Sequence, residues 1–228
     1  MYMMLVLFAM PLAWCLHPPV SMLNPRPSSL NVFTISPVPD SLFALMQGRS
    51  FAKGCTTKRD DLRYLKVLHY DELGKVQTGE LVCNKAIAQD LIEIFEELYL
   101  QHYVIARMRL IDEYDGDDQK SMTANNTSCF NYRMVSGTKT VSKHGRGMAI
   151  DINPLYNPYV RVRNGKTIVE PASALSFATG REALKKKNTK GVQQVIDRSD
   201  LCYRLFIQHG FRWGGAWRSS KDYQHFEK

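Results

Sequence analysis

The stretch SKHGRGMAIDINP, residues Ser142–Pro154, decides how the rest of this chain is interpreted. It places His144 and Asp151 seven residues apart. On one helix this spacing separates the two residues by about 10 Å along the axis. On one strand an odd separation sends their side chains to opposite faces. The two glycines of HGRG permit a tight reversal instead, followed by a short buried strand, Met148–Ile152. We therefore predict that the turn folds His144 back over the strand that presents Asp151.

A second motif, DYQHFE, lies at the C-terminal end of the chain and places His225 three residues after Asp222. Two imidazoles and one carboxylate, with a further carboxylate beside them, are the groups that a catalytic zinc centre requires. We predict His144, Asp151 and His225 as metal ligands and Asp222 as the general base. Glu227 is the rival base, or else the group that orients a ligand histidine from behind.

These motifs, in the order SxHxxGxAxDIN, WGGxW and DYxHFE, resemble the zinc D-alanyl-D-alanine carboxypeptidase family, which includes the vancomycin-resistance peptidases. Within it, the resemblance is strongest to the branch that contains L-alanyl-D-glutamate endopeptidases, and it extends from about Leu62 to the C-terminus. The segment NNTSCFNYR resembles the one that supplies the family's active-site arginine. The resemblance therefore implies that Arg133 anchors or polarises the substrate near the scissile carbonyl. Ala216 stands where the family has an acidic residue, which removes a supporting group but no metal ligand.

The resemblance implies an α+β fold, with a small antiparallel sheet flanked by helices and the zinc on one sheet face (hedgehog/DD-peptidase-like). It also implies zinc-dependent hydrolysis of peptide bonds in peptidoglycan stem peptides, by an endopeptidase or a D-alanyl-D-alanine carboxypeptidase. The alternative is a catalytically silent, metal-containing module that binds the cell wall. The expected partners are stem peptides rather than nucleic acid, and the expected state is a monomer.

Three further side chains have two interpretations each. Ser142 either hydrogen-bonds substrate or orients the loop that carries His144. Trp213 and Trp217 either line the substrate groove or belong to the aromatic core.

Composition and charge are those of a globular protein, with 44% hydrophobic and 23% charged residues. The net charge of +8 attracts polyanions, either nucleic acid or anionic wall polymer. Because only charge favours nucleic acid, we do not expect it as a partner. The five cysteines contain no CxxC pair, so a structural zinc site is not expected. Without Cys15, the remaining four are compatible with two disulfides or with free thiols.

The chain divides into three parts. Residues 1–16 are apolar and uncharged, as in a signal peptide, and predict export, with Cys15 as an alternative site for a lipid anchor. Residues 17–39 are rich in proline and predict an extended linker. Residues 40–228 are then the peptidase domain.

Within this domain, periodicity and turn signals predict a coarse order of elements. Asp112–Asp118 is interpreted as a solvated acidic turn, with calcium binding as the alternative. Residues 155–190 show no clear period and predict a long loop that walls the substrate groove. The remaining predictions are helices at Asp40–Met46, Lys85–Gln101 and from Ser199 or Asp200, a hairpin of Leu62–Tyr70 with a strand from Val76, and strands at Tyr103–Ile111 and Phe211–Trp213.

Overall fold

The computed structural model describes residues 31–181, 184 and 195–228. The predicted signal segment with Cys15, residues 17–30 of the predicted linker and the basic run around Lys185–Lys190 lie outside the described residues. No helix in the described part is long and apolar enough to cross a membrane. The four cysteines that it contains are free thiols rather than disulfides.

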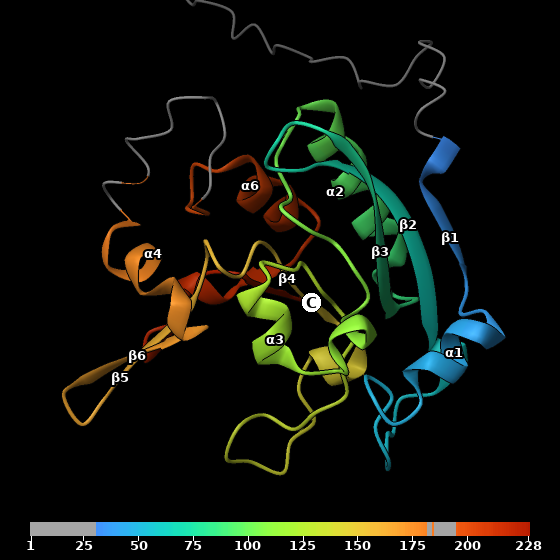
Figure 1. The fold of residues 1–228 in the computed structure, drawn as a ribbon, viewed down its shortest axis with the longest axis horizontal. Helices are drawn as coiled ribbons and strands as arrows, with labels where there is room; N and C mark the ends of the chain where they lie inside the picture. The colour runs from blue at the N-terminus through green and yellow to red at the C-terminus, as the bar shows by residue number, and fades with distance from the viewer. Residues whose placement is uncertain (1–30, 182–183, 185–194) are drawn as a thin grey trace, which may run out of the picture.

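The fold is α+β, as predicted, but its strands form three small antiparallel sheets rather than one (Figure 1). Their strand orders are β1-β2-β3, β4-β9-β7 and β6-β5-β8. The strands are β1 (Thr34–Pro37), β2 (Leu62–Tyr70), β3 (Val76–Asn84), β4 (Ala149–Asp151), β5 (Tyr159–Arg163), β6 (Lys166–Glu170), β7 (Arg212–Trp213), β8 (Ser220–Asp222) and β9 (His225–Glu227).

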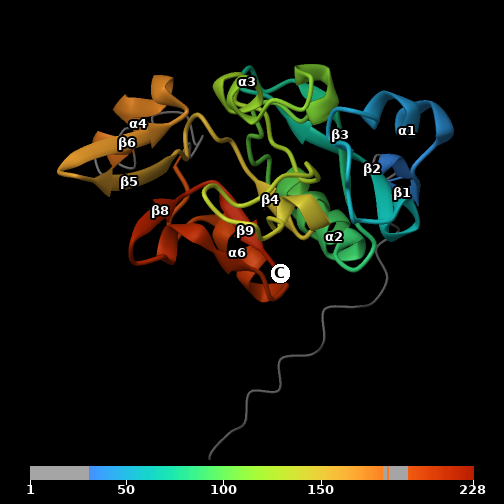
Figure 2. The ribbon, with the colours of Figure 1, turned by 90° about the horizontal axis from the view of Figure 1, so that it is seen from below.

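The helices are short apart from α2. Figure 2 shows α2 and α6 on one side of β4 and β9, and α3 on the opposite side, with the β5–β6 hairpin projecting from the body. The described helices are α1 (Asp40–Met46), α2 (Ala88–Leu100), α3 (Asp118–Thr123), α4 (Leu175–Thr179) and α6 (Leu201–Gln208).

The main core lies between the first sheet, α2 and α6. On α2, Leu91, Ile94 and Leu98 recur at helical spacing and are fully buried in this core. On β9, Phe226 stacks on Phe206 of α6 with ring centroids 4.3 Å apart. Since successive side chains of a strand point to opposite faces, His225 is directed away from the core. The same alternation separates Ile150 from Asp151 on β4. On each of the two strands, the apolar residue packs into the core, and its polar neighbour therefore points to the opposite face.

The predicted strand at Tyr103–Ile111 is wrong, although the hairpin before it is confirmed. Asparagine side chains bind the backbone of this segment in place of a strand ladder. The side-chain amide of Asn153 accepts from the backbone N–H of Ala106 through Oδ1 and donates to the carbonyl of Val104 through Nδ2. Asn126 binds both backbone groups of Arg109 in the same way. The segment therefore contacts the first sheet through one isolated bridge, between Val104 and Tyr70, and through the hydrogen bond from the Glu80 N–H to the Met108 carbonyl.

The predicted linker also needs correction at its end, because Thr34–Pro37 form β1 and pair with Arg63–Lys66 of β2. Proline lacks a backbone donor, but β1 is an edge strand and Pro37 is its last residue, where no ladder hydrogen bond has to be donated.

Candidate metal centre

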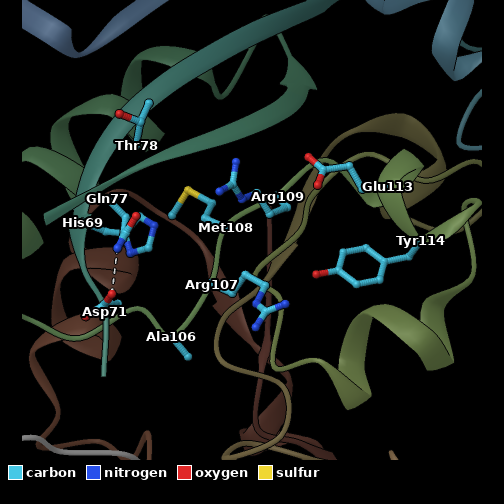
Figure 3. A pocket seen from close by; sticks show the side chains of 10 residues that line it. All are labelled: His69, Asp71, Gln77, Thr78, Ala106, Arg107, Met108, Arg109, Glu113 and Tyr114. Atoms are coloured by element: carbon cyan, nitrogen blue, oxygen red, sulfur yellow. Dashed lines mark hydrogen bonds between the residues drawn. The ribbon is translucent and has the colours of Figure 1, made fainter. Parts of the chain in front are cut away.

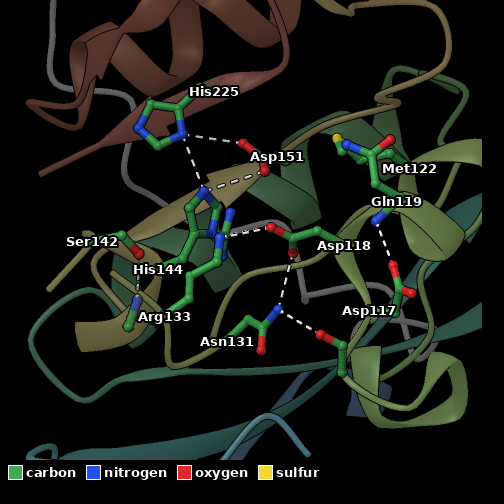
Figure 4. A network of polar contacts seen from close by, with 12 residues as sticks. Asp117, Asp118, Gln119, Met122, Asn131, Arg133, Ser142, His144, Asp151 and His225 are labelled. Carbon is green, nitrogen blue, oxygen red and sulfur yellow. Dashed lines mark hydrogen bonds and ion pairs between the residues drawn. The ribbon is translucent and has the colours of Figure 1, made fainter. Parts of the chain in front are cut away.

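The three predicted metal ligands lie together, although they are distant in sequence (Figure 4). Asp151 of β4 and His225 of β9 are direct cross-strand partners. His225 Nδ1 is 3.1 Å from Asp151 Oδ1 and 3.1 Å from His144 Nε2. His144 Nε2 is in turn 3.2 Å from Asp151 Oδ2. All three side chains are buried, so the predicted meeting of the two motifs occurs in the structure.

His144 reaches this position through the tight reversal predicted from the sequence. It begins a single 3-10 turn, His144–Arg146, which ends at Gly147 with φ of 67°. A Cβ at Gly147 would lie 2.6 Å from the backbone nitrogen of Asn84, at the end of β3. Only glycine fits both this backbone conformation and this close approach. The chain then enters β4, which presents Asp151.

Hydrogen bonds behind the two imidazoles determine which nitrogen of each faces the cluster. His144 Nδ1 lies 2.7 Å from the carbonyl oxygen of Cys129 and must donate to it, which leaves Nε2 as a ligand atom. The other ring nitrogen of His225, Nε2, lies 3.4 Å from Glu227 Oε2. Glu227 itself pairs with Arg212 at 2.9 Å. Carboxylates and carbonyls behind ligand histidines are typical of metal sites.

The residues fit a divalent metal ion of the zinc type. Two imidazole nitrogens and a carboxylate oxygen are among the usual zinc ligands, at about 2.0–2.2 Å. Ligand atoms at that distance and a tetrahedral angle are about 3.3 Å apart. The two imidazole nitrogens are 3.1 Å apart, and each lies 3.1 or 3.2 Å from a different oxygen of Asp151. His144, Asp151 and His225 would therefore hold the ion.

The electrostatics of the cluster agree with a site for a cation. Burial raises the pKa of Asp151, but the charges and hydrogen bonds of His144 and His225 lower it well below its ordinary value. Burial lowers the pKa of His225, but the carboxylates of Asp151 and Glu227 outweigh this effect and raise it to about 10. The cluster thus holds a carboxylate anion that favours positive charge on its neighbours.

The cluster opens into a pocket of about 370 Å³, which Asp222 also lines. Asp222 ends β8, and a bend at residues 223–224 leads to His225, so the base and the ligand predicted from DYQHFE share one site. Burial raises the pKa of Asp222 to about 7, against the lowering effect of nearby His225. Its Oδ1 atom is buried without a hydrogen-bond partner. An ionisable group of this kind in a pocket is a candidate for proton transfer.

Three more of the pocket's residues have a buried polar atom without a hydrogen-bond partner. Two are donors, Arg133 Nη1 and Arg161 Nε, and one is an acceptor, Gln224 Oε1. Because a buried unpaired polar group is costly, such atoms indicate a ligand that supplies the missing partners. A peptide offers both acceptors and donors.

Arg133 lines the pocket, as predicted, and its partner Asp118 was missed. Arg133 Nε pairs with Asp118 Oδ2 at 2.6 Å. Asn131 Nδ2 in turn donates to Asp118 Oδ1 at 2.9 Å (Figure 4). The interpretation of 112–118 as a solvated turn is therefore wrong for Asp118, and also for Asp112, which is buried and accepts from the N–H of Ser50. No local sequence signal identifies these tertiary contacts.

Ser142 and Trp217 line the pocket, whereas Trp213 lies in the main core. Ser142 lines the pocket, and its hydroxyl accepts from the N–H of Gly145 at 3.0 Å, which supports the loop-orienting interpretation. Trp213 belongs to the main core, with its indole N–H donated to the carbonyl of Tyr223, so the structure does not support the prediction that it binds substrate. Trp217 instead lines the pocket, 5.3 Å from the His225 ring.

The long loop predicted for 155–190 contains the β5–β6 hairpin, whose residues Tyr159, Arg161 and Glu170 line the pocket. Part of this region therefore lines the pocket beside the candidate metal cluster, and residues 159–170 form a hairpin where a loop is predicted. Asn164 and Gly165 at the tip have φ of 51° and 72°. Asn-Gly between alternating apolar residues is a strong hairpin signal, so YVRVR-NG-KTIVE could have been identified.

Another pocket, of about 460 Å³, lies beside β2 and the segment 106–114 (Figure 3). Its histidine, His69, is bound through Nδ1 to the carbonyl of Ile105. Asp71 accepts from two backbone N–H groups and from Gln77. Within the described part of the chain, the cluster of His144, Asp151 and His225 is the one group of three ligand residues that could hold a metal ion.

These observations define an α+β protein with a candidate metal centre next to a buried carboxylate and two arginines. Residues 136–228 match the family model described as D-alanyl-D-alanine carboxypeptidase. The predicted family resemblance is thereby confirmed over this segment, which is less than half of the chain and holds the three candidate ligands and Asp222. Arg133 lies just before it. No curated protein and no solved structure matches the chain.

Proposed function

We propose that this protein is a zinc peptidase that hydrolyses peptide bonds in peptidoglycan stem peptides. The observation that carries the proposal is one pocket in which a His–Asp–His cluster adjoins the carboxylate of Asp222, whose Oδ1 is buried without a hydrogen-bond partner. The family match over residues 136–228 supports the same chemistry and substrate class. The family's wall substrate also supports the proposal that the protein is exported, with its peptidase domain within residues 40–228.

His144, Asp151 and His225 would hold the metal. When bound, zinc supplies a Lewis acid that polarises a carbonyl and lowers the pKa of water. The carbonyl of Cys129 and the carboxylate of Glu227 hold the two imidazoles in position from behind.

Asp222 acts as the general base. Its carboxylate takes the proton of the attacking water and returns it to the leaving amine. With its pKa near 7, the group can exchange a proton in both directions close to neutral pH. Glu227 is not suited to this role, because it lies behind His225 and pairs with Arg212.

Arg133 stabilises the negative charge that develops on the scissile carbonyl oxygen. Its Nη1 is buried without a partner, while Asp118 fixes the guanidinium through Nε. A donor that is positioned before the reaction and left unpaired in the resting site is suited to an oxyanion.

The direct test is product analysis by mass spectrometry after incubation with purified peptidoglycan. Zinc-loaded protein should release stem-peptide fragments, chelator should abolish the release, and added zinc should restore it. Binding to peptidoglycan without any cleavage would favour the alternative, a silent wall-binding module.

A further inference from the structure

The pocket beside the metal cluster contains two arginines, and they differ in their pairing. Arg133 is bound to Asp118 through Nε at 2.6 Å, so its charge is partly balanced. Arg161 forms no ion pair or hydrogen bond with any described residue, and its Nε is buried. The ring of Tyr159 lies 6.0 Å from its guanidinium carbon. Arg161 is therefore the unbalanced cation of the pocket.

The strand register places Arg161 close to the proposed base. Tyr159 of β5 lies opposite Asp222 of β8, and Arg161 lies opposite Ser220. Residues two apart on a strand project from the same face, about 7 Å from each other. Tyr159 and Arg161 accordingly both line the pocket. The β5–β6 hairpin thus holds an arginine one strand repeat away from the position next to Asp222.

The nearby acidic residue on the hairpin does not neutralise Arg161. Glu170 of β6 also lines the pocket, but its cross-strand partner is Tyr159, whereas Arg161 lies opposite Ile168. No ion pair joins Arg161 and Glu170 among the described residues. No described residue supplies the partner that the guanidinium lacks, so a ligand in the pocket can supply it, and a carboxylate matches its planar donors best.

We propose that Arg161 is a specificity-determining residue that binds a free carboxylate of the substrate near the scissile bond. This rests on the proposed peptidase function, which makes the ligand a peptide. The two arginines then have different roles. Arg133 acts at the reacting carbonyl, and Arg161 binds a carboxylate of the substrate that does not react. The carboxylate can be the C-terminal one of a shortened stem or one within the peptide.

The test uses synthetic stem peptides in matched pairs, in which one carboxylate is replaced by a carboxamide. One pair changes the C-terminal carboxylate and another an internal one. Dissociation constants from calorimetry and kcat/KM are measured for zinc-loaded wild type, Arg161→Met, Arg161→Lys and Arg163→Met. Arg163 is the matched control, because it is an exposed arginine of the same strand that does not line the pocket.

We expect wild type to prefer the acid over the amide about ten- to a hundredfold in at least one pair. Arg161→Met should lose this preference with little change for the amide. Arg161→Lys should keep part of it, and Arg163→Met should keep all of it. The pair that responds identifies the carboxylate. The inference is overturned if Arg161→Met keeps the preference, if it weakens acid and amide equally, or if wild type shows no preference.

The two proposals fail in distinguishable ways. Acid-selective binding that depends on Arg161, without cleavage, would uphold this inference and contradict the peptidase function. Cleavage with the same acid preference in wild type and Arg161→Met would uphold the peptidase function and contradict the role of Arg161. Neither binding nor cleavage of any pair would overturn both.

Discussion

At Asp222, a carboxylate oxygen is buried without a partner and burial raises the pKa to about 7, within the pocket that the metal cluster adjoins. Asp222→Asn keeps the shape of the side chain but cannot accept a proton. We expect the variant to bind zinc in the same stoichiometry and to lose about 10²–10⁴-fold in kcat. Metal analysis and steady-state kinetics on stem peptides check both parts. Unchanged turnover would rule out Asp222 as the base.

Asp118 is a positioning residue, since it acts on Arg133 and is itself held by Asn131. Asp118→Asn removes the ion pair, and we expect kcat/KM to fall about tenfold while zinc content stays unchanged. The control is Asp117→Asn, one residue earlier. Asp117 caps α3 by accepting from the N–H groups of Gln119 and Lys120, and asparagine caps a helix equally well. Equal activity in the two variants would contradict the role of Asp118.

For single residues, the sequence predicts side chains whose chemistry is specific to a kind of site. It does not predict side chains whose role depends on a tertiary contact. Two histidines and a carboxylate in SKHGRGMAIDINP and DYQHFE suggest one metal site, and the structure brings them together. The pairing of Asp118 with Arg133 depends on where a helix of six residues docks, which no local pattern encodes. Trp213 and Trp217 are chemically alike, and only packing separates the core side chain from the one that lines the pocket.

Among the elements, the 3-10 turn at His144 depends on Gly147 for both its backbone conformation and its contact with β3. A matched pair of variants separates the two effects. Gly137→Ala, at φ of 75° with nothing within 4 Å of the added Cβ, should lose about 1 kcal/mol of unfolding free energy from backbone strain alone. Gly147→Ala adds the clash with Asn84 and should lose about 3 kcal/mol. Denaturant titration measures both, and equal losses would show that the contact with β3 is unimportant.

The start of α6 should make stability depend on pH. Asp200 caps this helix and is buried. Burial raises its pKa to about 7, although hydrogen bonds from the Tyr203 N–H and the Tyr103 hydroxyl lower it. A pKa raised above its unfolded value of 3.8 means that the folded state binds the proton more tightly. The unfolding free energy should therefore fall as pH rises from about 4 to about 7. Asp200→Asn should flatten this part of the profile, and parallel profiles would contradict the assignment.

Elements with a strong local period could be predicted from the sequence, and those defined by distant pairing could not. The β2–β3 hairpin and α2 have clear patterns and are found. The β5–β6 hairpin also has one, in its alternating valines and Asn-Gly turn, but its pairing with β8 spans about 60 residues of chain and has no local signal. The 103–111 segment has a strand-like sequence, but the side chains of Asn153 and Asn126 bind its backbone in place of a neighbouring strand.

For the molecule as a whole, the metal cluster joins the β4–β9 pair to the His144 turn, which packs on β3. A ligand that binds only the folded state stabilises it, by about 2.7 kcal/mol at a hundred times its Kd. For a chain of 228 residues this corresponds to a rise in Tm of about 5–10 °C. We expect zinc to produce this rise and chelator to reverse it in a thermal scan.

The matched variants for this scan are Asp151→Asn and His102→Asn. Asp151→Asn removes the anionic ligand and should lose most of the zinc-dependent rise. His102 is exposed, lies outside the cluster and has φ of 54°, a conformation that asparagine tolerates, so this variant should keep it. An unchanged rise in Asp151→Asn would place the stabilising zinc elsewhere.

We propose that two remote parts of the chain hold one divalent ion through His144 Nε2, Asp151 and His225 Nδ1. The most direct measurement is an anomalous difference map, recorded at the zinc absorption edge from crystals of the zinc-loaded protein. We expect one strong peak at about 2.0–2.2 Å from an atom of each of these three residues, in the pocket that Asp222 lines. A peak bound by other residues, or none at this cluster, would contradict it.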